Sequence, residues 1–247
     1  MNQKRDIMGM PVSIEIADKN AKTEHFDAVF DYLIHIDKKF STYKLESEIS
    51  KINRGEILPD EFSDEMKEVF KLSEETKNLT DGYFDIQRPD KTYDPSGLVK
   101  GLAIKNAALI LKSFGFENFY VDIAGDIQTS GLNNNTDWSI GIRNPFKRDE
   151  IVKVIYPKGK GVATSGVYIR GNHIYNPHSS SPVDSNVVSL TVIGPDIYEA
   201  DRIATAAFAM GEDGIKFIEN LDGFEGYSID KNGIATMTTN FENYTKI

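Results

Sequence analysis

The stretch Ala200-Asp201-Arg202-Ile203-Ala204-Thr205 lies within an apolar, alanine-rich segment that predicts a helix over residues 197–210. Asp201 and Thr205 are one helical turn apart, so this helix places two hard oxygens on one face. Such oxygens suit Mg²⁺, and the pair forms half of a possible metal site. From spacing alone, an exposed carboxylate and a threonine bonded to its own helix are the commoner outcome.

Two further segments, 94–101 and 163–168, are rich in small residues that let a backbone approach a phosphorylated ligand closely. Lys100 is expected to contact a phosphate or a carboxylate there, or else to be a solvated lysine in the first turn of a helix. Thr164, Ser165 and Gly166 offer hydroxyl and amide donors to a diphosphate, or else form a tight turn at a strand end. Together the three segments suggest metal-assisted phosphate chemistry.

The remaining sequence alternates strand and helix patterns and predicts an α+β fold with mixed, largely antiparallel sheets flanked by helices. Helices are expected over 26–40, 63–82, 98–114, 197–210 and 215–220. Strands are expected over 12–16, 119–123, 138–142, 152–156, 187–193, 225–229 and 234–238. No linker or repeat interrupts the pattern, so residues 1–247 are predicted to form a single domain.

Composition excludes several classes of protein. The net charge of -10 argues against nucleic acid as a partner, because binding to a phosphate backbone depends on clustered basic residues. The absence of cysteine excludes disulfides, thiolate zinc sites and cysteine nucleophiles. No apolar run approaches the roughly 18 residues of a membrane span, so no integral membrane segment is expected. The N-terminus has no signal-peptide pattern, which favours the cytoplasm, although a leader removed beforehand would leave the same sequence.

A series of short motifs follows the chain in a characteristic order. The motifs are Ser41-Thr42-Tyr43-Lys44, residues 47–53, Gly82-Tyr83-Phe84-Asp85, Lys100-Gly101-Leu102-Ala103, Thr164-Ser165-Gly166, His173-Ile174-Tyr175-Asn176-Pro177, and Ala200-Asp201 with Thr205. In number and order they resemble the FAD:protein FMN transferases, the ApbE-type flavin transferases. The resemblance extends from Met8-Gly9 to the last strands. It implies an ApbE-like fold and a Mg²⁺-dependent enzyme that takes FAD as substrate. Such an enzyme transfers FMN to a threonine of a client flavoprotein and releases AMP.

The resemblance also implies roles for particular residues. The metal ligands it implies are Asp201, Thr205 and the backbone carbonyl of Gly97. The residues expected to bind FAD are Met8, Ser41, Thr42, Tyr43, Asp85, Lys100, Gly125, Thr164, Ser165, Gly166 and His173. Catalytic roles are expected for Asp201, Lys100 and His173, with His173 as the general base because imidazole titrates near neutrality. Tyr43 is expected to stack on a flavin or adenine ring, or else to be a half-buried loop residue.

The segment around the expected base departs from the family pattern. Asn176 replaces the usual Asp, and His178-Ser179 replaces the usual Thr-Gly, which makes His178 a rival base. Lys105 also stands where an acidic residue is common. Two alternatives to the transferase are a non-catalytic FAD-binding or electron-transfer protein and an FAD pyrophosphatase that forms FMN and AMP. The changed segment around Asn176 suggests a third, a family member with a structural role only.

A buried Asp201 would need a cationic partner. Arg202 is expected to point elsewhere on the helix, which leaves a metal as the simpler partner. Asp126 is expected to orient polar groups of the ligand or to cap a turn.

Overall fold

The computed structural model describes residues 1–147, 149–166, 175–179, 181–183 and 185–245. Its centre is an eight-stranded sheet in which all neighbouring strands pair antiparallel. In spatial order the strands are β1 (Asn2–Ile7), β2 (Met10–Ile16), β3 (Phe119–Ile123), β4 (Asp126–Ser130), β9 (Gly161–Gly166), β12 (Val187–Gly194), β13 (Glu225–Asp230) and β14 (Ala235–Met237). The predicted α+β class is confirmed, and the single domain stays a prediction.

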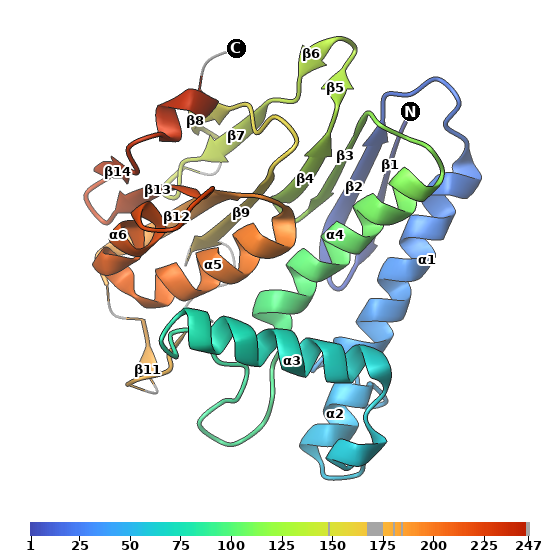
Figure 1. The fold of residues 1–247 in the computed structure, drawn as a ribbon, viewed down its shortest axis with the longest axis vertical. Coiled ribbons are helices and arrows are strands. Elements are labelled where there is room, and N and C mark those ends of the chain that lie inside the picture. The colour runs from blue at the N-terminus through green and yellow to red at the C-terminus, as the bar shows by residue number, and fades with distance from the viewer. Residues whose placement is uncertain (148, 167–174, 180, 184, 246–247) are drawn as a thin grey trace.

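Helices cover one face of the sheet, and a strand ribbon lies on the other (Figure 1). The helices are α1 (Thr23–Phe40), α2 (Glu48–Asn53), α3 (Asp64–Leu79), α4 (Ser96–Ser113), α5 (Ile197–Ala209) and α6 (Gly214–Glu219), with single 3₁₀ turns at Pro59–Glu61, Gly211–Asp213 and Phe241–Tyr244. Three two-stranded ribbons are β5 (Leu132–Asn133) with β6 (Thr136–Asp137), β7 (Ile140–Arg143) with β8 (Ile151–Ile155), and β10 (Tyr175–Asn176) with β11 (Ser181–Pro182).

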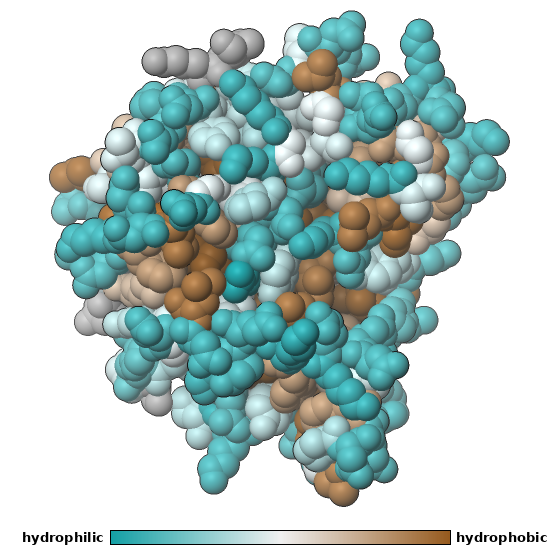
Figure 2. Space-filling model, viewed as in Figure 1, coloured by the Kyte–Doolittle hydropathy of each residue, from teal (hydrophilic) through white to brown (hydrophobic). Residues whose placement is uncertain are grey.

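Two hydrophobic cores hold these layers together. The larger lies between the sheet and the helices, and it includes Phe26, Phe30 and Leu33 of α1, all fully buried. The smaller lies under the β7–β8 ribbon on the opposite face and includes Ile155. Each such side chain contributes about 1.5–3 kcal/mol through burial. Figure 2 shows the helical face as mainly hydrophilic with hydrophobic residues between the elements, which agrees with the strong net charge.

Most predicted elements are present within two or three residues of their expected ends. The structure adds β1, α2, β4 and β9, which the sequence patterns did not predict. The prediction of a tight turn as the alternative for Thr164–Gly166 is wrong, because these residues complete β9 between β4 and β12. Strand β9 contains two glycines, a composition that local propensity assigns to turns. It is a strand because all of its residues pair with β12, and Gly161 and Val162 also pair with β4.

Two hairpin tips lie at the same end of neighbouring strands in the sheet. Met8-Gly9 joins β1 to β2, Ala124-Gly125 joins β3 to β4, and β2 pairs with β3. All four residues have positive φ, at 59° and 66° in the first tip and 54° and 95° in the second. This is the geometry of type I′ turns, in which glycine is favoured and a methionine or an alanine is uncommon. The Ala124 N–H donates to the carbonyl of Pro11 at 3.0 Å, which fixes the two tips side by side.

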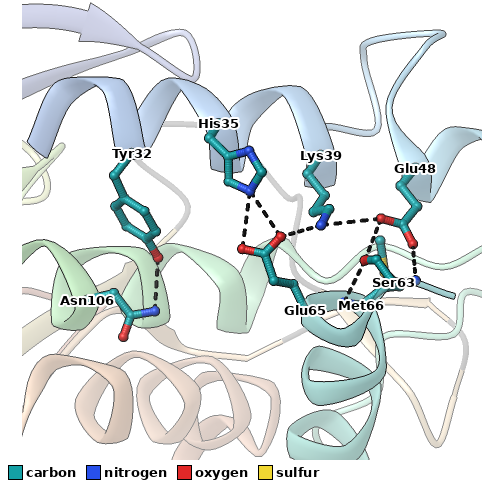
Figure 3. A network of polar contacts seen from close by, with 8 residues as sticks. All are labelled: Tyr32, His35, Lys39, Glu48, Ser63, Glu65, Met66 and Asn106. Carbon is teal, nitrogen blue, oxygen red and sulfur yellow. Dashed lines mark hydrogen bonds and ion pairs between the residues drawn. The ribbon is translucent and has the colours of Figure 1, made fainter. Parts of the chain in front are cut away.

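A polar network joins α1 to α2 and α3 (Figure 3). The carboxylate of Glu65 lies 3.0 Å from Nε2 of His35 and also contacts the ammonium of Lys39. The Lys39 ammonium lies 3.7 Å from Glu48, whose carboxylate accepts from the N–H and the hydroxyl of Ser63 at 2.8 and 2.7 Å. Because Ser63 caps α3, the network fixes the start of α3 against the C-terminal turns of α1.

We expect Glu65→Gln to lower stability at neutral pH and to matter less in acid. Partial burial raises the pKa of Glu65, but hydrogen bonds from Lys39 and His35 outweigh burial, so the pKa lies below its ordinary value. A lowered carboxyl pKa stabilises the fold above the unfolded-state pKa, and this contribution disappears as the pH falls through the folded-state pKa. The difference in thermal midpoint between wild type and Glu65→Gln should therefore shrink as the pH falls below about 4.3. A difference that stays constant with pH contradicts the charged network.

Candidate functional site

Two adjoining pockets lie where the hairpin tips meet the end of α1 and the start of α4. The first is lined by Tyr83, Phe84, Asp85, Arg88, Asp94, Ser96, Gly97, Lys100, Ala124, Thr164, Ser165, Gly166, Tyr175, Pro177, Asp201 and Thr205. The second is lined by Met8, Met10, Ile36, Asp37, Phe40, Ser41, Thr42, Tyr43, Asp94, Ser96, Val99 and Lys100. Asp94, Ser96 and Lys100 line both, so a single ligand can extend across them. Their volumes, open mouths included, are about 1060 and 580 Å³.

The three predicted metal ligands meet in the first pocket. Asp201 and Thr205 project from α5, and Gly97 lies in the first turn of α4. The Thr205 hydroxyl lies 3.4 Å from the carbonyl oxygen of Gly97 and donates to it. A Cβ at Gly97 would lie 3.1 Å from Cγ2 of Thr205, so the two helices are already in close contact there. The structure thus brings the three residues together, and the metal role stays a prediction.

Lys100 joins two buried carboxylates beside this group. Its ammonium contacts Oδ2 of Asp126 and lies 3.7 Å from Oδ1 of Asp201. The side chain of Lys100 is only 18% exposed, so a solvated first-turn lysine is ruled out. Oδ2 of Asp201 accepts from the N–H of Gly101 at 2.7 Å, and Oδ1 of Asp126 accepts from the N–H of Thr164 at 3.0 Å. Asp126 therefore supports Lys100 from the core.

The expectation that a metal is the simpler partner for Asp201 is wrong in part, because Lys100 already places a cation near its carboxylate. Arg202 does point elsewhere, with its Nε 2.9 Å from the carboxylate of Glu199. Burial raises the pKa of Asp201, the charge of Lys100 opposes this, and Asp126 raises the pKa further. Two carboxylates against one ammonium leave a buried excess of negative charge, which a further cation can neutralise.

The donor set fits Mg²⁺. The residues Asp201, Thr205 and Gly97 line one pocket, and their carboxylate, hydroxyl and backbone carbonyl are hard oxygens of the kind that Mg²⁺ prefers. Within the described part of the chain, no group of three or more His, Cys, Asp or Glu side chains is close enough to hold a metal. Such a sparse set does not suit Zn²⁺, which takes several nitrogen or sulfur ligands. It suits an ion that keeps waters and substrate phosphates in its coordination sphere.

The second pocket gathers the predicted residues from the N-terminal half. Met8, Ser41, Thr42 and Tyr43 all line it. The Tyr43 ring is 95% exposed, so the alternative of a half-buried loop tyrosine is wrong. Its loop is nevertheless fixed, because the Ser47 hydroxyl donates to the carbonyl of Ser41 at 2.7 Å. The pocket thus presents a free aromatic ring on an ordered loop.

The remaining predicted residues of the first pocket already have partners. The Asp85 carboxylate lies 2.8 Å from the ammonium of Lys77 and accepts from the N–H of Gln87 at 2.8 Å. The Thr164 hydroxyl is 2.9 Å from that of Thr191, and its N–H binds Asp126. Ser165 and Gly166 line the same wall. Thr164 is therefore bonded through both its side chain and its N–H.

Three predictions at the edge of the site have other outcomes. Gly125 is not among the described residues that line either pocket, because its N–H faces Asp122 at 2.7 Å and Ala124 takes the lining position. His173 lies outside the described residues. His178 is exposed, its ring 4.4 Å from that of Tyr83, and it is likewise absent from the described lining.

Sequence reasoning missed several residues of the first pocket. Arg88 and Asp94 form an ion pair in its wall, and Tyr175 donates from its hydroxyl to two backbone carbonyls nearby, at 2.9 and 3.0 Å. A local pattern in the sequence could have indicated Asp94, because an Asp two residues before Ser96 predicts a turn closed by the Asp carboxylate. In the structure this carboxylate accepts from the N–H of Ser96 at 3.1 Å. Arg88 had no comparable signal. Lys105, the other family departure, pairs with Asp196 at the start of α5 at 2.7 Å.

This architecture is the fold of the flavin transferases called ApbE. The crystal structure of flavin transferase ApbE from Vibrio cholerae superimposes with a TM-score of 0.87 at 23% identity, over 99% of this chain and 98% of that one. An ApbE protein from Thermotoga maritima gives a TM-score of 0.87 at 23% identity, over 100% and 99%. The sequence profile of the ApbE family matches residues 8–92 and 86–228. This chain belongs to the ApbE family.

The chain matches only part of the length of several curated relatives named FAD:protein FMN transferase. The Vibrio cholerae relative is 34% identical over 51% of this chain, and the Escherichia coli K12 relative is 28% identical over 63%. The matched segments span 40% and 47% of those relatives, less than half of their length. A Haemophilus influenzae relative is 24% identical over 83% of this chain and 78% of its own length.

Among the described residues, no helix has the length and apolar character needed to cross a bilayer.

Proposed function

We propose that this chain is a Mg²⁺-dependent FAD:protein FMN transferase that attaches the FMN part of FAD to a threonine of a client flavoprotein and releases AMP. The names of its relatives support the reaction. One observation supports it most strongly: Gly97, Asp201 and Thr205 line the same pocket as Lys100.

The proposed reaction is a phosphoryl-group transfer. The threonine oxygen forms a bond to the phosphorus of the FMN part, and the bond from that phosphorus to the bridging oxygen breaks. AMP leaves with the bridging oxygen, and the threonine proton passes to a base. Gly97, Asp201 and Thr205 would hold Mg²⁺, which supplies charge neutralisation at the diphosphate when bound.

The protein's own residues have distinct parts in this scheme. Lys100 donates to a phosphate oxygen, and Asp126 holds the lysine in place from the core. His173 is proposed as the base that accepts the threonine proton, with His178 as its rival. The two pockets share Asp94, Ser96 and Lys100, so an extended dinucleotide can lie across both.

Tyr43 provides a prediction that concerns binding alone. We expect Tyr43→Ala to weaken FAD binding by roughly two- to tenfold, because one aromatic contact contributes about 0.5–1.5 kcal/mol. Tyr43→Phe keeps the ring and should bind FAD as the wild type does. Since the side chain is exposed, neither variant should change the thermal midpoint. Flavin fluorescence titration measures the affinities, and equal affinities for wild type and Tyr43→Ala would exclude a stacking role.

The reaction itself is tested with an acceptor protein. The chain is incubated with FAD, Mg²⁺ and a flavoprotein domain that accepts FMN on threonine from an ApbE-family enzyme, and the intact mass of the acceptor is measured. We expect a gain equal to FMN, with loss of the gain in EDTA and in an acceptor whose threonine is replaced by alanine. AMP release without labelling would instead identify a pyrophosphatase. If neither AMP nor a labelled acceptor forms, the chain is a passive FAD-binding protein.

A further inference from the structure

Arg88 lies on a short ribbon, residues 85–94, that is fixed from both sides. Its two arms are bonded to each other, with the N–H of Arg88 2.8 Å from the carbonyl of Thr92. The Tyr175 hydroxyl donates to two backbone carbonyls of the first arm. On the second arm, the Asn53 side chain donates to the carbonyl of Tyr93 at 2.9 Å and accepts from its N–H at 2.7 Å. The backbone that carries Arg88 is therefore anchored, while its side chain is 42% exposed.

The charges of the first pocket distinguish Arg88 from Lys100. These two are the cationic residues among its described lining. Lys100 is 18% exposed and lies between two buried carboxylates, so much of its charge is already neutralised. Arg88 has a single, less buried partner in Asp94. Of the two, Arg88 has more positive charge available for an anion that enters the pocket.

The geometry places this guanidinium at the junction of the two pockets. Asp94 lines both pockets, and its Oδ1 is fixed by the N–H of Ser96 at 3.1 Å. Its Oδ2 contacts Nη2 of Arg88. A guanidinium has five N–H donors, so this contact leaves others for a ligand. A ligand that occupies both pockets therefore passes close to the Arg88–Asp94 ion pair.

We propose that Arg88 is a phosphate-binding residue of this site, and that Asp94 is a positioning residue that holds the guanidinium toward the ligand. The ligand class is a dinucleotide or nucleoside diphosphate, recognised through its phosphate oxygens. Arginine suits this task because its planar fork can hold two phosphate oxygens at once. The inference rests on the proposed function for the identity of the dinucleotide, FAD.

The test compares two ligands that carry a diphosphate, FAD and ADP, with one that does not, riboflavin. FAD, ADP and riboflavin are titrated calorimetrically, with Mg²⁺ present, into wild type, Arg88→Gln, Arg88→Lys and the control Lys91→Gln. The control removes one charge from the exposed tip of the same ribbon. In Arg88→Gln we expect FAD and ADP to bind roughly 10- to 100-fold more weakly, the range of a charged hydrogen bond. Riboflavin should bind as in the wild type, and Arg88→Lys should recover only part of the loss.

Asp94→Asn tests the positioning role. It should weaken ADP binding in the wild type and have no further effect in Arg88→Gln, a coupling that a purely structural role of Asp94 does not produce. The proposal is overturned if ADP affinity in Arg88→Gln stays within twofold of wild type, or if riboflavin binding falls equally. Its failure is separable from that of the transferase, because ADP binding that depends on Arg88 stands even if no acceptor is labelled. If the acceptor is labelled normally but ADP affinity does not depend on Arg88, the role of Arg88 is rejected and the transferase proposal stands.

Discussion

Asp201→Asn is expected to reduce AMP release from FAD by about 10³-fold or more, since charge neutralisation at the reacting phosphates is often the largest catalytic contribution. The amide keeps the size of the carboxylate and an oxygen that can accept from the N–H of Gly101. It removes the negative charge that would bind Mg²⁺. Some FAD affinity should remain, because the second pocket is unchanged. Chromatographic measurement of AMP at saturating FAD and Mg²⁺, with the acceptor protein present, gives the rate.

Two controls separate this effect from a general disturbance of α5. Glu199→Gln removes a carboxylate from the same helix at a position bonded to Arg202 and outside the described pocket lining, and it should keep normal AMP release. Thr205→Val removes the second proposed side-chain ligand and should also slow release strongly. If Asp201→Asn releases AMP within tenfold of the wild-type rate, the metal-ligand role of Asp201 is wrong.

Gly101→Ala is expected to destabilise the protein and impair catalysis together. A Cβ there would lie 2.7 Å from Cβ of Asp201 and 2.9 Å from the carbonyl oxygen of Ile197. Alanine favours a helix over glycine by about 1 kcal/mol, but overpacking in a dense core typically costs about 1–3 kcal/mol. With contacts this short, we expect the clash to dominate and to separate α4 from α5. The net loss should be about 1–2 kcal/mol, a fall in Tm of roughly 2–8 °C.

The matched control for this prediction is Lys112→Ala, an exposed position near the end of the same helix. It should change stability by less than about 0.5 kcal/mol. Differential scanning calorimetry gives both values, and AMP release should fall in Gly101→Ala because Asp201 moves with α5. A Gly101→Ala protein with the wild-type Tm and rate would show that the two helices adjust without cost.

The elements with strong periodicity were predictable from sequence. The stripe of Phe26, Phe30 and Leu33 predicts α1, and alternation around Val121 predicts β3, because each pattern reflects one buried face. Strand β9 was not predictable from local pattern. Its small residues favour a turn, and only pairing with β4 and β12 makes it a strand. Edge strand β1 is largely polar and was missed for a related reason.

The site was predictable where the family resemblance reached it. Residues as distant as Met8, Gly97 and Thr205 were named from motifs, and the structure places them in adjoining pockets. The contact of Lys100 with Asp126 was not predictable, because it depends on the packing of α4 against β4. Arg88 was missed because no motif contains it. Residues whose role depends on a tertiary neighbour leave little trace in a single sequence.

The most direct test of the account is a crystal structure of the protein with FAD and Mn²⁺ in place of Mg²⁺, using anomalous scattering to locate the metal. We predict one anomalous peak within coordination distance of Asp201, Thr205 and the carbonyl of Gly97, in contact with the diphosphate of the nucleotide. A metal bound elsewhere, or a nucleotide bound in these pockets with no metal at that position, would contradict the account.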